Sequence, residues 1–208
     1  TVTVTGVDDN STDGHKAYNI SLSAEIVEMH APDNWTASNT TPDVQLNGVT
    51  YGNNIFVAVG DNGTTYYSTD NGTNWNAGSS GTTKDLWGVE YGNNTFVAVG
   101  ESGVLLTSTN GTGWENNTDN NTANNLTSSC LYGVTYGNGI FVAVGDSGTI
   151  LTSSNGSAWS IDQEYITDYN LNGVAYGNGT FVAVGDSGVR ATSSTNGSAW
   201  SINQQDIT

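Results

Sequence analysis

The sequence is dominated by short apolar runs separated by turns rich in glycine and asparagine. A run of the form Leu-x-Gly-Val-x-Tyr is followed by Gly-Asn-Asn or Gly-Asn-Gly, then by Phe-Val-Ala-Val, then by Asp-Ser-Gly or a close variant, and then by a third short run. Runs of this kind, bounded by such turns, predict β-strands joined by tight hairpins. The apolar residues show no period of 3.6, which excludes a helical solenoid.

The pattern occurs four times, and this repetition predicts the fold class. The copies begin at Leu46, Leu86, Leu131 and Leu171, about 40 residues apart. Four antiparallel strands in about 40 residues match one blade of a β-propeller. We therefore predict an all-β propeller with four visible four-stranded blades, which span 46–85, 86–130, 131–170 and 171–208.

The second strand of each copy, Phe-Val-Ala-Val, is apolar on both of its faces. Such a strand needs cover on both sides, and stacked blades provide it. The outer faces of the first and last blades would then stay bare. Three arrangements would cover them: closure into a four-bladed ring, self-assembly with another chain through the open ends, or further blades. The sequence ends where a fifth Leu-x-Gly-Val could begin, which favours a longer parent chain.

The turn after the third strand resembles a known motif. The segment 68–75, Ser-Thr-Asp-Asn-Gly-Thr-Asn-Trp, resembles the Asp-box of BNR-type propellers, a sialidase-like superfamily fold also found in many non-enzymatic secreted proteins. Its defining residues here are Ser68, Asp70, Gly72 and Trp75. The other copies keep the glycine and the tryptophan, as Gly111 and Trp114, Gly156 and Trp159, and Gly197 and Trp200. Counted back from tryptophan, their Asp position holds Thr109, Ser154 and Thr195.

This resemblance implies that the box is a fold-stabilising turn placed away from any active site. A short polar side chain would cap the turn, and the tryptophan would hold it against the blade. We therefore expect the four tryptophans to occupy equivalent buried sites.

The N-terminal part of the chain differs from the repeats. Residues 1–30 alternate, turn through an acidic stretch and alternate again, and they resemble the last hairpin of a Calx-β or Ig-like module of bacterial surface proteins. Residues 31–45 contain both prolines and predict a linker. The loop that carries Asp8, Asp9 and Asp13 could bind Ca²⁺, which prefers several oxygen ligands. The alternative is an ordinary asparagine- and aspartate-rich turn.

The charge of the chain narrows the range of partners. The formal net charge is −17, and Lys16, Lys84 and Arg190 are the only lysines and arginines. Such a surface repels phosphates, so neither nucleic acid nor an anionic membrane surface is an expected partner. The acidity either keeps the protein soluble or attracts cationic partners. No stretch has the length of a transmembrane helix, so no direct membrane insertion is expected.

Several features bear on the compartment. Cys130 is the only cysteine, which excludes an intrachain disulfide, and beside Leu131 we expect a small buried hydrophobic residue. No signal peptide is present, so Thr1 would follow a removed signal or lie within a longer chain. Glycosylation motifs outside the repeat pattern occur at Asn34, Asn39, Asn116, Asn120 and Asn125, although this composition also produces them by chance. We expect an extracellular or cell-surface protein.

The sequence offers little catalytic chemistry. Gly-Asp-Ser-Gly at 145–148 and 185–188 matches a serine-protease nucleophile motif, but the only histidines are His15 and His30, outside the blades, so a catalytic triad lacks its base. Sialidases clamp the substrate carboxylate with three arginines, and the whole chain has one. No pair of carboxylates is singled out for glycoside hydrolysis. We therefore expect no catalytic residue, and no cofactor other than the Ca²⁺ considered above.

Positions that differ between the copies are the best candidates for function, because strictly repeated positions build the blade. After the first leucine the copies carry Asn47, Trp87, Tyr132 and Asn172, and three residues later the second copy carries Glu90. First strands line the centre of a propeller, where aromatic and amide side chains suit a sugar or a peptide. The alternative is that these aromatics pack between blades.

The sequence therefore predicts a non-catalytic extracellular or cell-surface binding or structural module. One alternative is part of a carbohydrate-active enzyme. The other is an assembly-factor-type propeller that grips one protein partner. Neither the ligand nor the number of blades in the whole protein follows from the sequence.

Overall fold

The computed structural model describes residues 44–118, 127–163, 165–194 and 197–203. The chain divides after residue 37 into two units. The predicted hairpin 1–30 and nearly all of the linker 31–45 lie outside the described residues, so both stay predictions.

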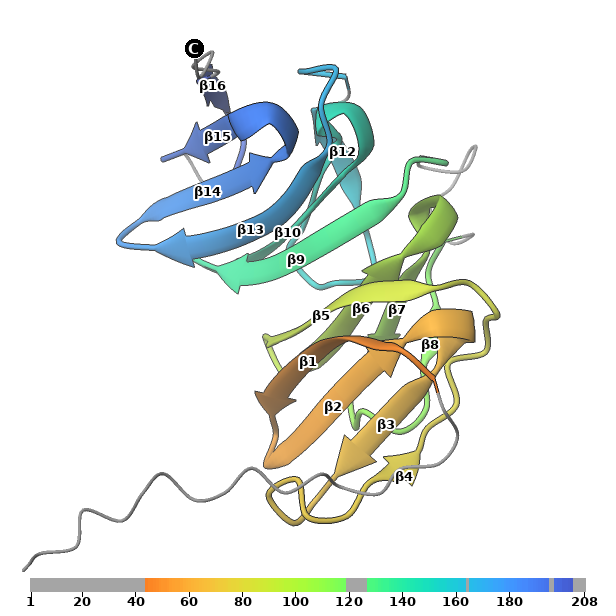
Figure 1. Cartoon of the computed structure of the whole chain (residues 1–208). Helices are drawn as coiled ribbons and strands as arrows, with labels where there is room; N and C mark the ends of the chain where they lie inside the picture. The colour runs from red at the N-terminus through yellow and green to blue at the C-terminus, as the bar shows by residue number, and fades with distance from the viewer. Residues whose placement is uncertain (1–43, 119–126, 164, 195–196, 204–208) are drawn as a thin grey trace, which may run out of the picture. The chain divides into compact units, whose positions relative to one another are not determined.

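Each repeat forms one antiparallel four-stranded sheet, which we number as blades 1 to 4. Strands that are consecutive in sequence are neighbours in the sheet (Figure 1). Blade 1 consists of β1 (Leu46–Gly52), β2 (Ile55–Gly60), β3 (Thr65–Ser68) and β4 (Asn76–Ala77). Blade 2 consists of β5 (Leu86–Gly92), β6 (Thr95–Gly100), β7 (Leu105–Ser108) and β8 (Glu115–Asn116). Blade 3 consists of β9 (Leu131–Gly137), β10 (Ile140–Gly145), β11 (Ile150–Ser153) and β12 (Ser160–Gln163). Blade 4 consists of β13 (Leu171–Gly177), β14 (Thr180–Gly185), β15 (Arg190–Ser193) and β16 (Ser201–Asn203).

The hairpin between the first and second strands has the predicted turn. In blade 1 its two central residues, Asn53 and Asn54, have φ values of 47° and 62°, and in blade 3 Asn138 and Gly139 have 48° and 84°. Positive φ at both positions twists the hairpin in the same sense as its strands, and asparagine and glycine tolerate that conformation best.

The Asp-Ser-Gly segments form single turns of 3-10 helix after each second strand. They are η1 (Asp61–Gly63), η2 (Glu101–Gly103), η3 (Asp146–Gly148) and η4 (Asp186–Gly188). In η3 the backbone N–H of Thr149 donates to the carbonyl of Asp146 at 2.9 Å, which closes the turn. Each blade places this segment at the same position, as a repeated turn requires and a single catalytic nucleophile does not.

A β-bulge interrupts every first strand at its second residue. In β1, Leu46 pairs with Gly60 and Gly48 pairs with Val59, so Asn47 between them has no partner on β2. The same shift leaves out Trp87, Tyr132 and Asn172 in the other blades. The variable residues that follow the first leucine of each copy are thus the four bulge residues.

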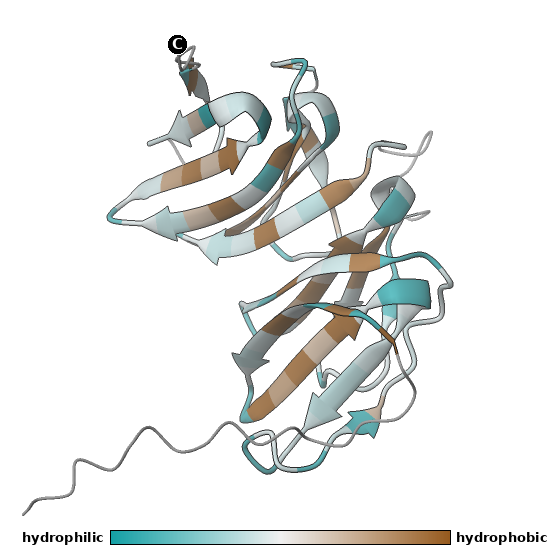
Figure 2. Cartoon of the chain, in the orientation of Figure 1, coloured by the Kyte–Doolittle hydropathy of each residue, from teal (hydrophilic) through white to brown (hydrophobic). Residues whose placement is uncertain are grey.

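The second strands are covered on both faces where a blade has two neighbours. In β6 the side chains of Val97, Ala98 and Val99 are all fully buried, and Figure 2 shows the apolar character of the second strands as brown along β2 and β14. Alternate residues of one second strand belong to different apolar clusters, one shared with the preceding blade and one with the following blade. The core of the protein therefore lies between the blades.

The first strands lie side by side, with β1 next to β5, β5 next to β9, and β9 next to β13. Within the described residues the four sheets do not close into a ring. The outer faces of blades 1 and 4 accordingly expose apolar side chains, such as Val49 with 64% and Val184 with 48% of its surface exposed.

Candidate functional site

The bulge residues lie at one end of the sheets, beside the acidic residue that opens each 3-10 turn. Asn47 Nδ2 donates to Asp61 Oδ1 at 2.9 Å, and Asn172 Nδ2 donates to Asp186 Oδ1 at 2.6 Å. A bulge re-aims the side chain of its extra residue, and bulges are common beside functional sites. In blades 1 and 4 the bulge thus turns the variable residue toward the carboxylate of its own blade.

The bulge residues of blades 2 and 3 form an aromatic pair. The rings of Trp87 and Tyr132 stack across blades 2 and 3, with centroids 5.1 Å apart and planes 28° apart, and both side chains stay partly exposed. The hydroxyl of Tyr132 donates to Asp146 Oδ1 at 2.7 Å. Burial, followed by this hydrogen bond, raises the pKa of Tyr132. The pair packs between blades, as the alternative interpretation required, and still presents an aromatic surface to solvent.

Glu90 is held by its own surroundings. Its Oε1 accepts a hydrogen bond from the backbone N–H of Tyr91 at 2.9 Å, and the hydroxyl of Thr50 in blade 1 also donates to its carboxylate. Burial nevertheless raises the pKa of Glu90, because the two hydrogen bonds offset only part of the cost of removing the carboxylate from water. Glu90 thus has a role in joining blades 1 and 2.

The acidic residues beside the bulges hold the segments that lead into their own blades. Asp146 Oδ2 accepts from the backbone N–H of Cys130 at 2.8 Å, and Glu101 pairs with Lys84 at 3.4 Å. Cys130 is partly exposed, so the expectation of a buried residue is wrong; its sulfur accepts from the backbone N–H of Ser102, and burial raises its pKa. The carboxylates are therefore structural, and together they make this end of the sheets acidic.

The turn after β3 has the hydrogen bonds expected of a polar cap. Asp70 Oδ1 accepts from the Ser68 hydroxyl at 2.9 Å and from the backbone N–H of Asn74 at 2.8 Å, while Ser68 Oγ accepts from the N–H of Gly72 at 2.9 Å. The hydrogen bond from the backbone of Asn74 is the main reason why the pKa of Asp70 is lowered. The segment that resembles an Asp-box is a self-contained turn.

Asparagine takes the place of this aspartate in blades 2 and 3. Asn110 Oδ1 accepts from the N–H groups of Thr112 and Gly113, and Asn155 Oδ1 accepts from those of Ser157 and Ala158. The assignment of the Asp position to Thr109 and Ser154 is therefore wrong, because these two turns are one residue shorter. Counting forward from the serine, as Ser-x-Asp or Ser-x-Asn, identifies the capping residue correctly.

Three of the four tryptophans bond to their own turn. The indole Nε1 donates to the carbonyl of the turn glycine at 3.0 Å in Trp75, 2.6 Å in Trp159 and 2.8 Å in Trp200. Only Trp159 is buried, with 4% of its surface exposed, and the others are partly exposed. The expectation of four buried tryptophans is thus correct for Trp159 alone.

Trp114 departs from this arrangement because its turn pairs with the connection between blades 1 and 2. Its backbone N–H donates to the carbonyl of Ser79 at 3.2 Å, and the N–H of Ser79 donates to the carbonyl of Thr112 at 2.9 Å. The Nε1 atom of Trp114 is buried without a hydrogen-bond partner. It lies in a pocket of about 470 Å³ shared with Asn155 and Ser157 of blade 3.

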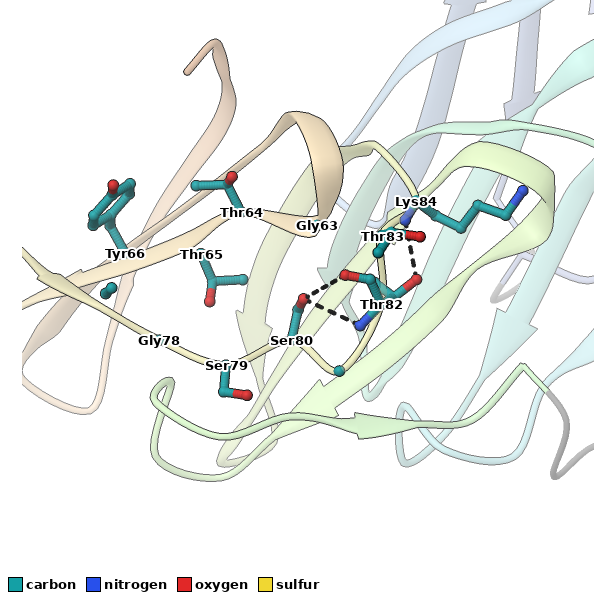
Figure 3. Close-up of a pocket in the computed structure, with 12 residues that line it drawn as sticks. Gly63, Thr64, Thr65, Tyr66, Gly78, Ser79, Ser80, Thr82, Thr83 and Lys84 are labelled. Carbon is teal, nitrogen blue, oxygen red and sulfur yellow. Dashed lines mark hydrogen bonds between the residues drawn. The ribbon is translucent and has the colours of Figure 1, made fainter. Parts of the chain in front are cut away.

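A second pocket, of about 770 Å³, lies between β3 and the connection 78–84 (Figure 3). Its lining is rich in short hydroxyl side chains, and Ser80 and Thr82 hydrogen-bond to one another there. Thr65 Oγ1 is buried in this wall without a partner. The pocket is separate from the bulge residues. The groups of its lining suited to acid–base chemistry are the phenol of Tyr66 and the amine of Lys84, which is paired with Glu101.

Other predicted sites lie mostly beyond the described ranges. The Ca²⁺ candidates Asp8, Asp9 and Asp13, and the glycosylation candidates Asn34, Asn39, Asn120 and Asn125, are outside them. Asn116 is exposed on β8. In the part of the chain that the structure describes, no group of three or more His, Cys, Asp or Glu side chains could hold a metal ion. Over the same ranges, no helix has the length and apolar character needed to cross a membrane.

No family model matches this chain, and no curated protein matches it in sequence. Solved structures do match. YCF48 bound to D1 peptide is 16% identical over 79% of this chain and 55% of that chain, with a TM-score of 0.62. The WD40 β-propeller domain of Doa1 is 13% identical over 76% of this chain and 54% of that chain, with a TM-score of 0.53. The likeness shows a β-propeller fold. The GH74 enzyme of Niastella koreensis is 24% identical over 77% of this chain and 24% of that chain, with a TM-score of 0.53. The chain spans little more than half the length of the YCF48 and Doa1 chains that it matches.

Proposed function

We propose that this chain is a non-catalytic propeller module, secreted or at the cell surface, that binds a polypeptide segment through its bulge residues. The observation that carries the proposal is that the bulge position of the first strand is one at which the copies differ, with an aromatic residue in two blades and asparagine in the other two. Bulged positions are where a β-sheet can present a side chain for recognition.

The chemistry of this end favours a basic segment as the ligand. Trp87 and Tyr132 offer partly exposed aromatic surface, on which an arginine or lysine side chain of a ligand can stack. Asp61, Asp146 and Asp186 lie beside the bulge residues of blades 1, 3 and 4. The net charge of −17 would also attract a cationic segment from a distance.

Peptide binding is known for a protein of similar fold. A protein with a similar fold, YCF48, has been solved with a peptide bound. The carboxylates beside the bulge residues accept hydrogen bonds from the side chains of Asn47 and Asn172 and from the backbone N–H of Cys130, which favours a binding role over acid–base catalysis.

The test is a pair of screens on the full chain. Random peptide display on the wild type selects binders, and a glycan array is probed in parallel. We expect enrichment of peptides rich in Lys and Arg and no glycan signal. Binding of glycans without enrichment of peptides would contradict the proposal and favour the alternative of a carbohydrate-active protein.

A further inference from the structure

Every blade has two different faces, and the three internal contacts always join them in the same order. The forward face consists of the two valines of the second strand, such as Val97 and Val99. The backward face of the next blade consists of the first-strand leucine and valine with the second-strand phenylalanine and alanine, such as Leu131 and Phe141. Because the same contact occurs three times, a forward face is expected to bind the backward face of another blade of this type.

Among the described residues, one face of each kind is bare. The forward face of blade 4 exposes Val182 and Val184, by 39% and 48%, although the equivalent valines of the other blades are fully buried. The backward face of blade 1 exposes Leu46 by 43% and Val49 by 64%, whereas the equivalent Leu86 is fully buried. The two bare faces are thus the two halves of the internal contact.

A tyrosine and a glycine interlock at every internal contact. The ring of Tyr91 lies over Gly52 of the preceding blade, and the same holds for Tyr136 over Gly92; a Cβ on either glycine would come within about 2 Å of the ring. The bare faces carry the same glycine and tyrosine, but neither makes this contact with another blade. Gly177 has nothing within 4 Å of its Cβ position, and Tyr51 is 53% exposed.

A second interlock joins a valine of the second strand to a glycine of the following blade, in the turn after its third strand (the outer turn). A Cβ on Gly111 would lie 2.6 Å from Val57 Cγ2, and one on Gly156 would lie 2.7 Å from Val97 Cγ2. The equivalent glycine of blade 1, Gly72, meets only its own Trp75, at 4.0 Å. Its counterpart on the free forward face is Val182.

Polar groups are matched as well. At internal contacts the second residue of a 3-10 turn donates its N–H to the side chain of the residue before the next first strand: Asn62 to Asp85 Oδ1 at 2.8 Å, and Ser147 to Asn170 Oδ1 at 3.1 Å. The equivalent donor on blade 4 is Ser187, and its expected acceptor is Gln45 Oε1 before β1.

We propose that two copies of this chain dock head to tail, with the forward face of blade 4 against the backward face of blade 1 of the other copy. Tyr51 of one copy then covers Gly177 of the other. This inference concerns the outer faces of the propeller and does not depend on the proposed ligand. Head-to-tail contacts close into a ring when the rotation allows it, and two copies that make the contact twice would give eight blades, at the upper end of the usual number.

The experiment is the mass of the full chain in solution, by sedimentation velocity across concentrations up to about 100 µM, a range that detects micromolar association. The wild type should reach twice 21.7 kDa. Val184→Asp on the forward face and Tyr51→Asp on the backward face should each abolish the dimer. Ile161→Asp, a matched change at a residue that is 39% exposed on blade 3 and outside both bare faces, should leave it intact.

Mixing the two variants identifies the geometry. Each variant keeps one intact face, so an equimolar mixture of Val184→Asp and Tyr51→Asp should form a dimer through the one remaining contact, although neither variant dimerises alone. A monomeric wild type throughout the range, a dimer that survives Val184→Asp, or a mixture that stays monomeric would each overturn the proposal. Circular dichroism of each variant confirms that the loss of the dimer is not a loss of folding.

Discussion

The ring of Tyr91 in blade 2 lies against Gly52 in blade 1, so closely that a Cβ on the glycine would fall 2.0 Å from Cγ of the tyrosine. The same contact recurs between blades 2 and 3 and between blades 3 and 4. Glycine at this position is therefore needed to let the next blade approach. The repeat unit encodes its own stacking, and each blade is completed only by its neighbour.

A pair of equivalent glycines tests this packing. Gly92→Ala should lower the free energy of unfolding by about 1–3 kcal/mol, because the added methyl group must displace the ring of Tyr136. Gly177→Ala should change it by less than about 0.5 kcal/mol at concentrations too low for association, because nothing lies near its Cβ position. Urea denaturation measures both. Equal costs for the two variants would show that the contact does not limit the approach of the blades.

The capping role of asparagine in the outer turn gives a second prediction. Asn155→Ala should cost about 1 kcal/mol, because the N–H groups of Ser157 and Ala158 lose their acceptor. Asn155→Asp should keep most of the stability, since Asp70 performs this role in blade 1. Thermal denaturation of both variants provides the comparison. If aspartate proved as harmful as alanine, the hydrogen bonds would not be what stabilises the turn.

The tryptophans of the outer turns should differ in their contribution to stability. Trp159→Ala should cost about 3–5 kcal/mol, because the side chain is 4% exposed and its Nε1 donates to the Gly156 carbonyl. Trp75→Ala should cost less, because that side chain is partly exposed although it makes the same hydrogen bond. Denaturant titrations measure the two costs. A larger loss for Trp75 would contradict the link between burial and stability at this position.

Glu90 provides a prediction about pH. Burial raises its pKa above the unfolded value of about 4.3, so the folded state binds this proton more tightly, and the free energy of unfolding falls as the pH rises through the folded pKa. Glu90→Gln removes this loss. The variant should gain stability relative to wild type at pH 7 and show little gain below about pH 4. A difference that is the same at both pH values would mean that the carboxylate does not titrate as proposed.

Most of the fold could be predicted from the sequence because its signals are local. The apolar run of Phe141 to Val144 and the asparagine–glycine turn before it specify strand and hairpin without help from the rest of the chain. The bulge at Asn47 could not be predicted, because it depends on how β1 pairs with β2. The altered setting of Trp114 depends on Ser79, from a different repeat.

The candidate site was predicted as a set of residues, and its arrangement came from the structure. Comparing the copies singled out Trp87 and Tyr132, since a repeat makes variation visible. The stacking of the two rings follows from the approach of neighbouring blades. The hydrogen bond from the hydroxyl of Tyr132 to Asp146 depends on the bulge within blade 3. Glu90 lies in the same strand as Trp87, yet its hydrogen bonds tie it to Tyr91 and Thr50.

The central claim is that the bulge residues bind a basic polypeptide segment, and the affinity of a selected peptide for the wild type and for Trp87→Ala tests it most directly. Trp87→Ala should weaken binding about tenfold or more, as expected for an aromatic residue central to an interface. Tyr165→Ala, at a tyrosine that is 69% exposed and outside the site, should leave the affinity unchanged. Wild-type affinity in the Trp87→Ala variant, or an equal loss in both variants, would contradict the account.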